Sequence, residues 1–273
     1  MATAHVTKSP PEKAQSRSSR VQSVDRAMSL LEALAEEDEG CRLIDLASRT
    51  QLSSSTAHRL LTTLQQRHFV QFDAVEGVWH VGRQSFVVGA GFARRRNYVA
   101  TALPYLRRLR DMTRETANLG LAEDGDVVVV SQAESREIMR AITRVGGRVP
   151  MANSGMGKAL LATFPVEEVA ANVAIRGMHR YTPKSIQRMS VLKEELEAVR
   201  INGYAVDDEE YQVGLRCIAA AVYNSQSEAL CAVSVSGLSA RLTNDRVEPI
   251  GEVVAQVARE LTAALGGISP QRG

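Results

Sequence analysis

A glycine-rich stretch, Ser154-Gly-Met-Gly-Lys158, is a first place where residue types and spacing could do chemistry. A phosphate-binding loop requires GxxxxGK followed by Ser or Thr, but Ala152 replaces its first glycine and Ala159 follows the lysine. The stretch therefore does not fit a nucleotide-binding loop. Glycines ahead of a helix expose backbone N–H groups at the positive end of the helix dipole, which suits a small carboxylate. An ordinary helix cap is the alternative interpretation.

Further polar residues lie at the ends of, or within, apolar β-prone stretches. Ser234 and Ser236 alternate with valines, so both hydroxyls face one side of a strand and need partners, from a ligand or from neighbouring backbone. Cys217 begins another apolar strand, where a free cysteine is usually a small buried residue, and Asp207 opens an acidic run typical of a solvated loop. His179 is the one histidine after residue 114 and lies far along the chain from the cysteine. We therefore expect no catalytic residue, no metal site and no cofactor.

Residues 54–66 have the pattern of an amphipathic helix whose exposed face carries no acid. Its apolar residues recur at i, i+3, i+4 and i+7, and the serines ahead of it are suited to cap its N-terminus. In a helix-turn-helix such a helix enters the major groove, where Arg59 could bind guanine through two hydrogen bonds while the serines bind phosphate. A merely solvated helix face is the alternative. The candidate DNA-binding residues are Ser54, Ser55, Thr56, His58, Arg59 and Thr62.

The surrounding pattern predicts a winged helix-turn-helix over residues 21–83. One helix begins with Ser23 as its N-cap and ends before Gly40, and a short second helix contains residues 43–47. Two β-prone runs, 69–72 and 78–81, enclose a loop and predict a hairpin, the wing. Asp73 and Glu76 lie at its tip, so we expect His80 and Arg83, rather than a cation at the tip, to contact the DNA backbone.

The rest of the chain divides into three further segments. Residues 1–20 are polar and basic and predict a flexible arm, and residues 84–101 predict a linker helix that yields at Gly89 and Gly91. Residues 102–273 predict an α+β domain in which Pro104 restarts a helix. That domain has a hairpin at 118–132, strands at 138–145, 204–207, 216–223 and 229–236, and helices at 157–164, 167–175, 191–202 and 244–265.

Composition agrees with a DNA-binding module joined to a second domain. Residues 1–114 hold 17 Lys and Arg against 11 Asp and Glu, whereas residues 115–273 hold 16 against 20. This balance disfavours an architectural protein that binds DNA without regard to sequence. Three cysteines without a CxxC spacing indicate neither a disulfide framework nor a zinc site. With no bilayer-spanning apolar run and no secretion signal, the sequence predicts a cytoplasmic protein without membrane contact.

The stretch LIDLASRTQLSSSTAHRLLTTLQQRHFV, followed by WHVG, resembles the DNA-binding half of the IclR family of bacterial transcription regulators. Residues 150–161, 203–210, 213–221 and 234–246 are similar to that family's effector-binding domain. Within the family the resemblance is strongest to repressors of purine catabolism that respond to allantoin and glyoxylate. It implies an α+β chain with an N-terminal winged helix-turn-helix, a linker helix and a C-terminal GAF-like effector domain with an antiparallel sheet.

The same resemblance implies a repressor that a small 2-oxo acid such as glyoxylate releases from its operator DNA, as a dimer on DNA and a tetramer of two dimers. Two alternatives remain: an activator or repressor that responds to another organic acid, such as an aromatic catabolite, and more remotely an enzyme that uses Cys217. Met156 stands where those relatives have a much smaller alanine, which bears on the identity of the ligand. The positions that match the effector pocket are Ser154, Gly155, Met156, Asp207, Cys217, Ser234, Val235 and Ser236.

Overall fold

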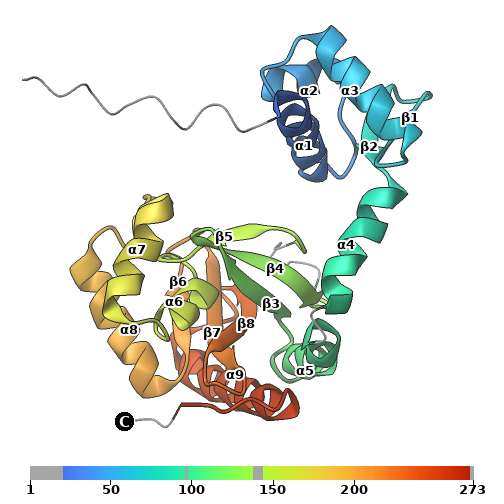
Figure 1. Cartoon of the computed structure of the whole chain (residues 1–273). Helices are drawn as coiled ribbons and strands as arrows, with labels where there is room; N and C mark the ends of the chain where they lie inside the picture. Colours follow the sequence, from blue (N-terminus) through green and yellow to red (C-terminus); the bar gives the residue numbers. More distant parts are fainter. Residues whose placement is uncertain (1–20, 96–97, 138–143, 271–273) are drawn as a thin grey trace, which may run out of the picture. The chain divides into compact units, whose positions relative to one another are not determined.

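The computed structural model describes residues 21–95, 98–137 and 144–270 (Figure 1). The chain forms two compact units, Met1–Arg95 and Arg96–Gly273. The predicted α+β class with two domains is confirmed. None of the helices in the described ranges is long and apolar enough to cross a membrane.

The first unit packs three helices against a two-stranded hairpin. Its elements are α1 (Gln22–Ala35), α2 (Leu43–Arg49), α3 (Ser54–Gln66), β1 (Val70–Asp73), β2 (Val78–Val81) and α4 (Arg83–Arg95). Leucines from the first three helices and Trp79 of the hairpin form one core, in which Leu30, Leu46 and Leu61 are fully buried. Because these apolar residues recur at helical spacing, their burial fixes which face of α3 points outward.

The start of α1 differs from the sequence-based expectation. The N-cap is Val21 and its side chain caps no backbone N–H, so Ser23 lies inside the helix. At α3 the capping prediction is confirmed, since the hydroxyl of Ser53 accepts a hydrogen bond from the N–H of Thr56. Packing of the apolar face, rather than a cap, therefore fixes where α1 begins.

The second unit is built on one antiparallel sheet. Its elements are α5 (Tyr98–Thr113), β3 (Thr116–Glu123), β4 (Asp126–Ala133), β5 (Arg148–Pro150), α6 (Gly155–Leu161), α7 (Val166–Arg176), α8 (Met189–Asn202), β6 (Ala205–Asp208), β7 (Leu215–Tyr223), β8 (Ala229–Leu238) and α9 (Asn244–Ala264). Within the described residues the strand order is β5-β4-β3-β8-β7-β6. Helices α5 and α9 cover one face of the sheet and α6, α7 and α8 the other (Figure 1). Each face is a hydrophobic core, so the strands are buried on both sides.

Two expectations about this unit need correction or fall outside the described residues. Pro104 does not restart a helix, because α5 already begins at Tyr98 and the proline lies inside it. The strand predicted over 138–145 falls mostly on residues 138–143, outside the described residues, and the strand observed nearby is β5 at Arg148–Pro150. The other predicted helices and strands lie within a few residues of the observed ones.

Candidate DNA-binding and effector sites

The predicted DNA-binding residues are brought together on the outer face and the N-terminal turn of α3. Ala57, Leu61 and Leu64 face the core, whereas Ser54, Ser55, His58 and Arg59 are exposed and Thr56 and Thr62 are half-buried. The hydroxyl of Ser53 lies 3.2 Å from that of Ser55 and donates to that of Thr56 at 2.9 Å. This cluster of hydroxyls around the N-terminus of α3 can donate to a phosphate group.

A groove of about 630 Å³ runs between α3 and α1. It brings Arg26 of α1 to the same surface as Arg59, and none of the described residues that line it is acidic. Arg26 was missed in the sequence because periodicity shows which face of α1 is polar but not that this face borders α3. The lining residues are Gln22, Ser23, Arg26, Thr56, His58, Arg59, Leu60, Thr62 and Thr63. Two arginines on a groove whose described lining holds no acidic residue suit the DNA backbone.

Asp73, one of the two acidic residues of the wing, binds backbone N–H groups of the wing itself. Asp73 Oδ1 accepts hydrogen bonds from the N–H groups of Glu76 at 3.1 Å and of Val75 at 2.8 Å, which lower the pKa of this carboxyl. His80 lies against Gly40, where a Cβ atom would come within 2.5 Å of the imidazole ring. The DNA contact expected of His80 stays a prediction, and its ring also has a packing role in the domain.

Five of the eight predicted effector residues line one cavity of about 250 Å³ in the second unit. They are Ser154, Met156, Asp207, Cys217 and Ser236. The other lining residues are Arg144, Gly147, Arg148, Val149, Tyr211, Gln212 and Leu215. These were not foreseen, because they come from β5, the start of β7 and loops whose contact with the cavity depends on how the chain folds back.

The remaining three predicted positions lie beside the cavity rather than in its wall. Gly155 approaches β7 so closely that a Cβ atom there would lie 3.1 Å from both the carbonyl oxygen and the sulfur of Cys217. Ser234 is fully buried, and Asn118 of β3 donates to its hydroxyl at 3.3 Å and to that of Ser236 at 3.2 Å. Val235 packs in the core beneath α5 and α9. A side-chain amide, which the sequence did not suggest, thus satisfies both serines.

Met156 fits because a glycine faces it. At Gly120 of β3, a Cβ atom would lie 2.7 Å from the Met156 sulfur. The missing side chain therefore leaves room for the thioether, which reduces the space available to a ligand on that side of the cavity.

Asp207 has an unusual carboxyl group. It is 2% exposed, and burial raises its pKa to about 7, with a smaller contribution from the negative charge of Glu210. Backbone N–H groups of Glu210 and Tyr211 donate to its Oδ1 at 2.8 and 3.4 Å and partly oppose that rise, as does Lys158. Asp207 is therefore partly protonated at neutral pH and can either accept or donate a hydrogen bond.

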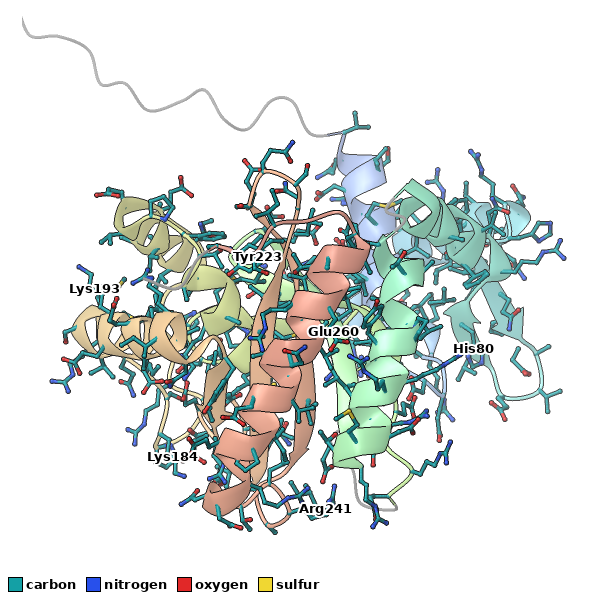
Figure 2. All side chains as sticks on the ribbon, turned by 90° about the horizontal axis from the view of Figure 1, so that it is seen from below. His80, Lys184, Lys193, Tyr223, Arg241 and Glu260 are labelled. Atoms are coloured by element: carbon teal, nitrogen blue, oxygen red, sulfur yellow. The ribbon has the colours of Figure 1, made fainter. Side chains whose placement is uncertain are left out.

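Lys158 is completely buried beside this acidic loop. Its ammonium donates to Glu210 at 2.6 Å and to Glu195 at 3.0 Å. Burial acts to lower the pKa of Lys158, but the two carboxylates outweigh it and raise the pKa, so the ammonium stays charged. Oε2 of Glu210 is buried and has no hydrogen-bond partner among the described residues. Lys184 donates to Asp208 and Glu209 from the outer side of the same loop (Figure 2).

Cys217 does not have the environment of a nucleophile. Burial raises the pKa of its thiol to about 11, so the neutral thiol predominates. The three cysteines are free and buried. Among the described residues, no group of His, Cys, Asp and Glu is arranged to hold a metal ion.

Comparisons with known proteins agree with this architecture. A model of the IclR helix-turn-helix domain matches residues 23–74, and a model of the C-terminal domain of bacterial IclR transcriptional regulators matches residues 91–263. The chain is 39% identical over 250 residues to the acetate operon repressor of Salmonella typhimurium, covering 91% of each chain. It is 35% identical over 250 residues to the transcriptional repressor AllR of Klebsiella pneumoniae, covering 92% of each chain.

A solved structure extends the likeness to three dimensions. The IclR transcriptional regulator of Alicyclobacillus acidocaldarius superposes with a TM-score of 0.78 at 25% identity, covering 90% of this chain and 100% of that one. The family models match both domains and together span most of the chain. The protein therefore belongs to the IclR family of bacterial transcriptional regulators.

Proposed function

We propose that the protein is a transcriptional repressor of allantoin or glyoxylate catabolism, released from its operator by a small 2-oxo acid such as glyoxylate. The observation that carries this proposal is the cavity that collects Ser154, Asp207, Cys217 and Ser236. Its volume of about 250 Å³ lies below the range usual for drug-sized ligands and suits a small acid. Repression is supported by the relatives, which include an acetate operon repressor and AllR repressors.

Asp207 explains how such a cavity accepts an anion. A fully ionised carboxylate would repel the carboxylate of the ligand, but a pKa of about 7 leaves much of Asp207 neutral at physiological pH. Glyoxylate hydrate carries two hydroxyl groups that can donate to the ionised fraction. Arg144 and Arg148 also line the cavity, but the guanidinium of Arg148 is already paired with Glu123 and Asp126, so the donors left for the anion are the hydroxyl and backbone groups of the wall.

The protein is proposed to bind DNA as an assembly of several copies. One recognition helix reads few base pairs, so we infer a dimer on a pseudo-palindromic operator. The resemblance to the family further suggests a tetramer of two such dimers. Apolar side chains left exposed on the DNA-binding unit support a second copy as their partner: Val24 and Met28 on α1 are 56% and 44% exposed, and Phe86 on α4 is 78% exposed.

A thermal-shift panel of 2-oxo acids, ureides and aromatic acids tests the ligand class. A compound that binds only the folded state raises its stability with concentration, so glyoxylate should raise the melting temperature, whereas no benzoate-sized acid should give a shift that is lost in Met156→Trp, the variant that fills the first cavity. Asp207→Asn should weaken glyoxylate more than a 2-oxo acid that does not hydrate. Equal losses for both ligands in calorimetry would refute the role given to Asp207.

An activator or repressor that responds to an aromatic catabolite is the alternative within the family. The small volume of the cavity and the Met156 thioether in its wall disfavour it. A large thermal shift with aromatic acids, lost when Met156 is changed to Trp, would favour it over the 2-oxo acid.

A further inference from the structure

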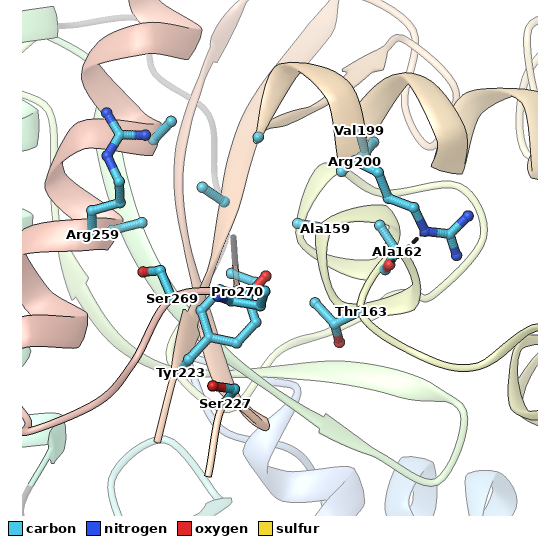
Figure 3. A pocket seen from close by; sticks show the side chains of 15 residues that line it. Ala159, Ala162, Thr163, Val199, Arg200, Tyr223, Ser227, Arg259, Ser269 and Pro270 are labelled. Carbon is cyan, nitrogen blue, oxygen red and sulfur yellow. Dashed lines mark hydrogen bonds between the residues drawn. The ribbon is translucent and has the colours of Figure 1, made fainter. Parts of the chain in front are cut away.

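The effector domain contains a second cavity that shares no lining residue with the first. It has a volume of about 620 Å³ and lies between α6, α8, α9 and the last part of β7 (Figure 3). The residues that line it are Ala159, Ala162, Thr163, Val199, Arg200, Gly203, Ala220, Ala221, Tyr223, Ser227, Ala255, Ala258, Arg259, Ser269 and Pro270. Six of them are alanines, so part of the wall is apolar and lies close to the backbone.

The cavity exists because two strands differ in length. Strand β6 pairs with β7 only through Arg216–Ala219, whereas β7 continues to Tyr223. Beyond the end of β6, the edge of β7 is bordered by small side chains from the neighbouring helices instead of by another strand. A short stretch of uncovered strand edge is thus left beneath a small-residue pocket.

Polar groups in the cavity are mostly hydrogen-bond donors or cations. Figure 3 shows Tyr223 in its middle, with Arg259 and Ser269 on one side and Ala159 and Ala162 on the other. The Tyr223 hydroxyl has no hydrogen-bond partner among the described residues, and burial raises the pKa of this phenol, so it remains a donor. Arg259 donates to the amide oxygen of Gln256 and makes no ion pair with the described residues. None of the described lining residues is acidic.

We propose that this cavity is a second ligand site, for a monocarboxylate with a flat apolar body such as benzoate or 3-phenylpropanoate. The alanine walls take the ring, and the Tyr223 hydroxyl and Arg259 bind the carboxylate. Its volume lies within the range of small-molecule sites, whereas the first cavity is smaller. The proposal of this second site does not depend on which effector binds the first cavity.

The two cavities lie along the same elements. Ser154 and Met156 meet the first cavity at the start of α6, and Ala159 and Ala162 meet the second at its end. Likewise β7 brings Cys217 to the first cavity and Tyr223 to the second. A ligand in the second cavity that shifts α6 against β7 therefore changes affinity at the first, and the effect is reciprocal.

Calorimetric titration of the full chain with benzoate and 3-phenylpropanoate tests the site. Wild type should bind at least one of them saturably, and benzyl alcohol, which lacks the carboxylate, more weakly. Tyr223→Phe should raise Kd by roughly three- to tenfold through loss of one hydrogen bond. Arg259→Gln should also raise Kd, while Lys193→Gln, an exposed lysine of α8 outside the cavity, should not. Ala221→Leu should abolish binding by filling the cavity.

Three results would overturn the proposal. The first is no saturable binding of either acid to the wild type. The second is binding that survives Tyr223→Phe and Ala221→Leu but is lost in Met156→Trp, which would place the acid in the first cavity. The third is a change in sedimentation caused by Ala221→Leu with acid binding intact, which would assign the cavity to a contact between copies. If Ala221→Leu fails to fold, Tyr223→Phe and Arg259→Gln still decide between these outcomes.

Discussion

The two candidate sites satisfy their polar groups in opposite ways. On α3 the side chains of Ser55, His58 and Arg59 are exposed, so solvent can hydrate them in the absence of DNA. Around the effector cavity, polar groups are buried and bonded to one another, as in the Asn118 amide between two serines. An exposed polar group keeps its hydration in the free protein, whereas a buried polar group without a partner lowers the free energy of unfolding.

Substitutions therefore affect the two sites differently. Substitutions on α3 should change DNA affinity and leave folding intact. Substitutions around the effector cavity should change ligand affinity and the free energy of unfolding together, because the same bonds serve both.

The largest effect is expected at Lys158. Lys158→Met leaves Glu210 buried without its counter-charge, and breaking a buried ion pair from one side costs about 3 to 5 kcal/mol. Urea unfolding should show this loss. Lys193→Met, on the exposed surface of α8 (Figure 2), is the matched control and should change stability little. If Lys158→Met unfolds at the same urea concentration as wild type, removing a charge from the buried network costs no more stability than removing one from the exposed surface.

Asp207 should make stability depend on pH. Its folded pKa of about 7 exceeds the usual 3.8, so the stabilisation it contributes is complete below the usual value and is lost as pH rises through about 7. Relative to Asp207→Asn, wild type should lose about 2 kcal/mol between about pH 5.5 and about pH 8. Paired unfolding curves at both pH values measure the difference.

Asp208 provides the control for this titration. Arg216 and Lys184 more than offset the effect of its partial burial and hold its pKa below the usual value, so the stability difference between wild type and Asp208→Asn should stay constant over the same pH range. A parallel pH dependence in wild type and Asp207→Asn would assign the titration to another group.

On the DNA side, Arg59→Ala should cost about 1 to 3 kcal/mol on the operator and less on random DNA. Arg26→Ala should weaken both similarly and reduce the salt slope by about 1, as loss of a phosphate contact does. Fluorescence anisotropy across a salt series separates the two. Equal losses on both sequences for Arg59→Ala would make it a phosphate contact as well, and a drop in stability would break the contrast between the sites.

Much of the fold follows from local pattern. The spacing of Ala57, Leu61 and Leu64 predicted α3 and its outward face, and β-prone apolar runs over residues 216–223 and 229–236 predicted β7 and β8. Periodicity does not show which strands are neighbours. Asn118 meets Ser234, 116 residues away, only because β3 pairs with β8.

The interior of the effector site was harder to predict for the same reason. Lys158 looked like part of a glycine-rich loop, yet it is the centre of an ion-pair cluster whose carboxylates lie 37 and 52 residues further along the chain. Arg144 and Arg148 of the cavity wall were likewise not predicted, because no motif near them in the sequence indicates ligand binding. The roles of Ser53 and Arg59 depend on their own helix and can be predicted from the neighbouring sequence. The contacts of buried partners from distant segments cannot.

The smallest expected effect concerns coupling between the two functions. Helix α4 continues through Gly89 and Gly91, and a Cβ atom at Gly89 would meet nothing within 4 Å. Changing both glycines to alanine should therefore stabilise the helix by roughly 1 kcal/mol per residue without touching either site. We expect glyoxylate to weaken operator binding by about 1 to 3 kcal/mol in wild type, and the operator to weaken glyoxylate binding by the same factor. If bending of α4 carries this coupling, the double variant should reduce it while both separate affinities persist. Gel-shift titration with ligand measures the coupling, and wild-type induction in the double variant would place the hinge outside α4.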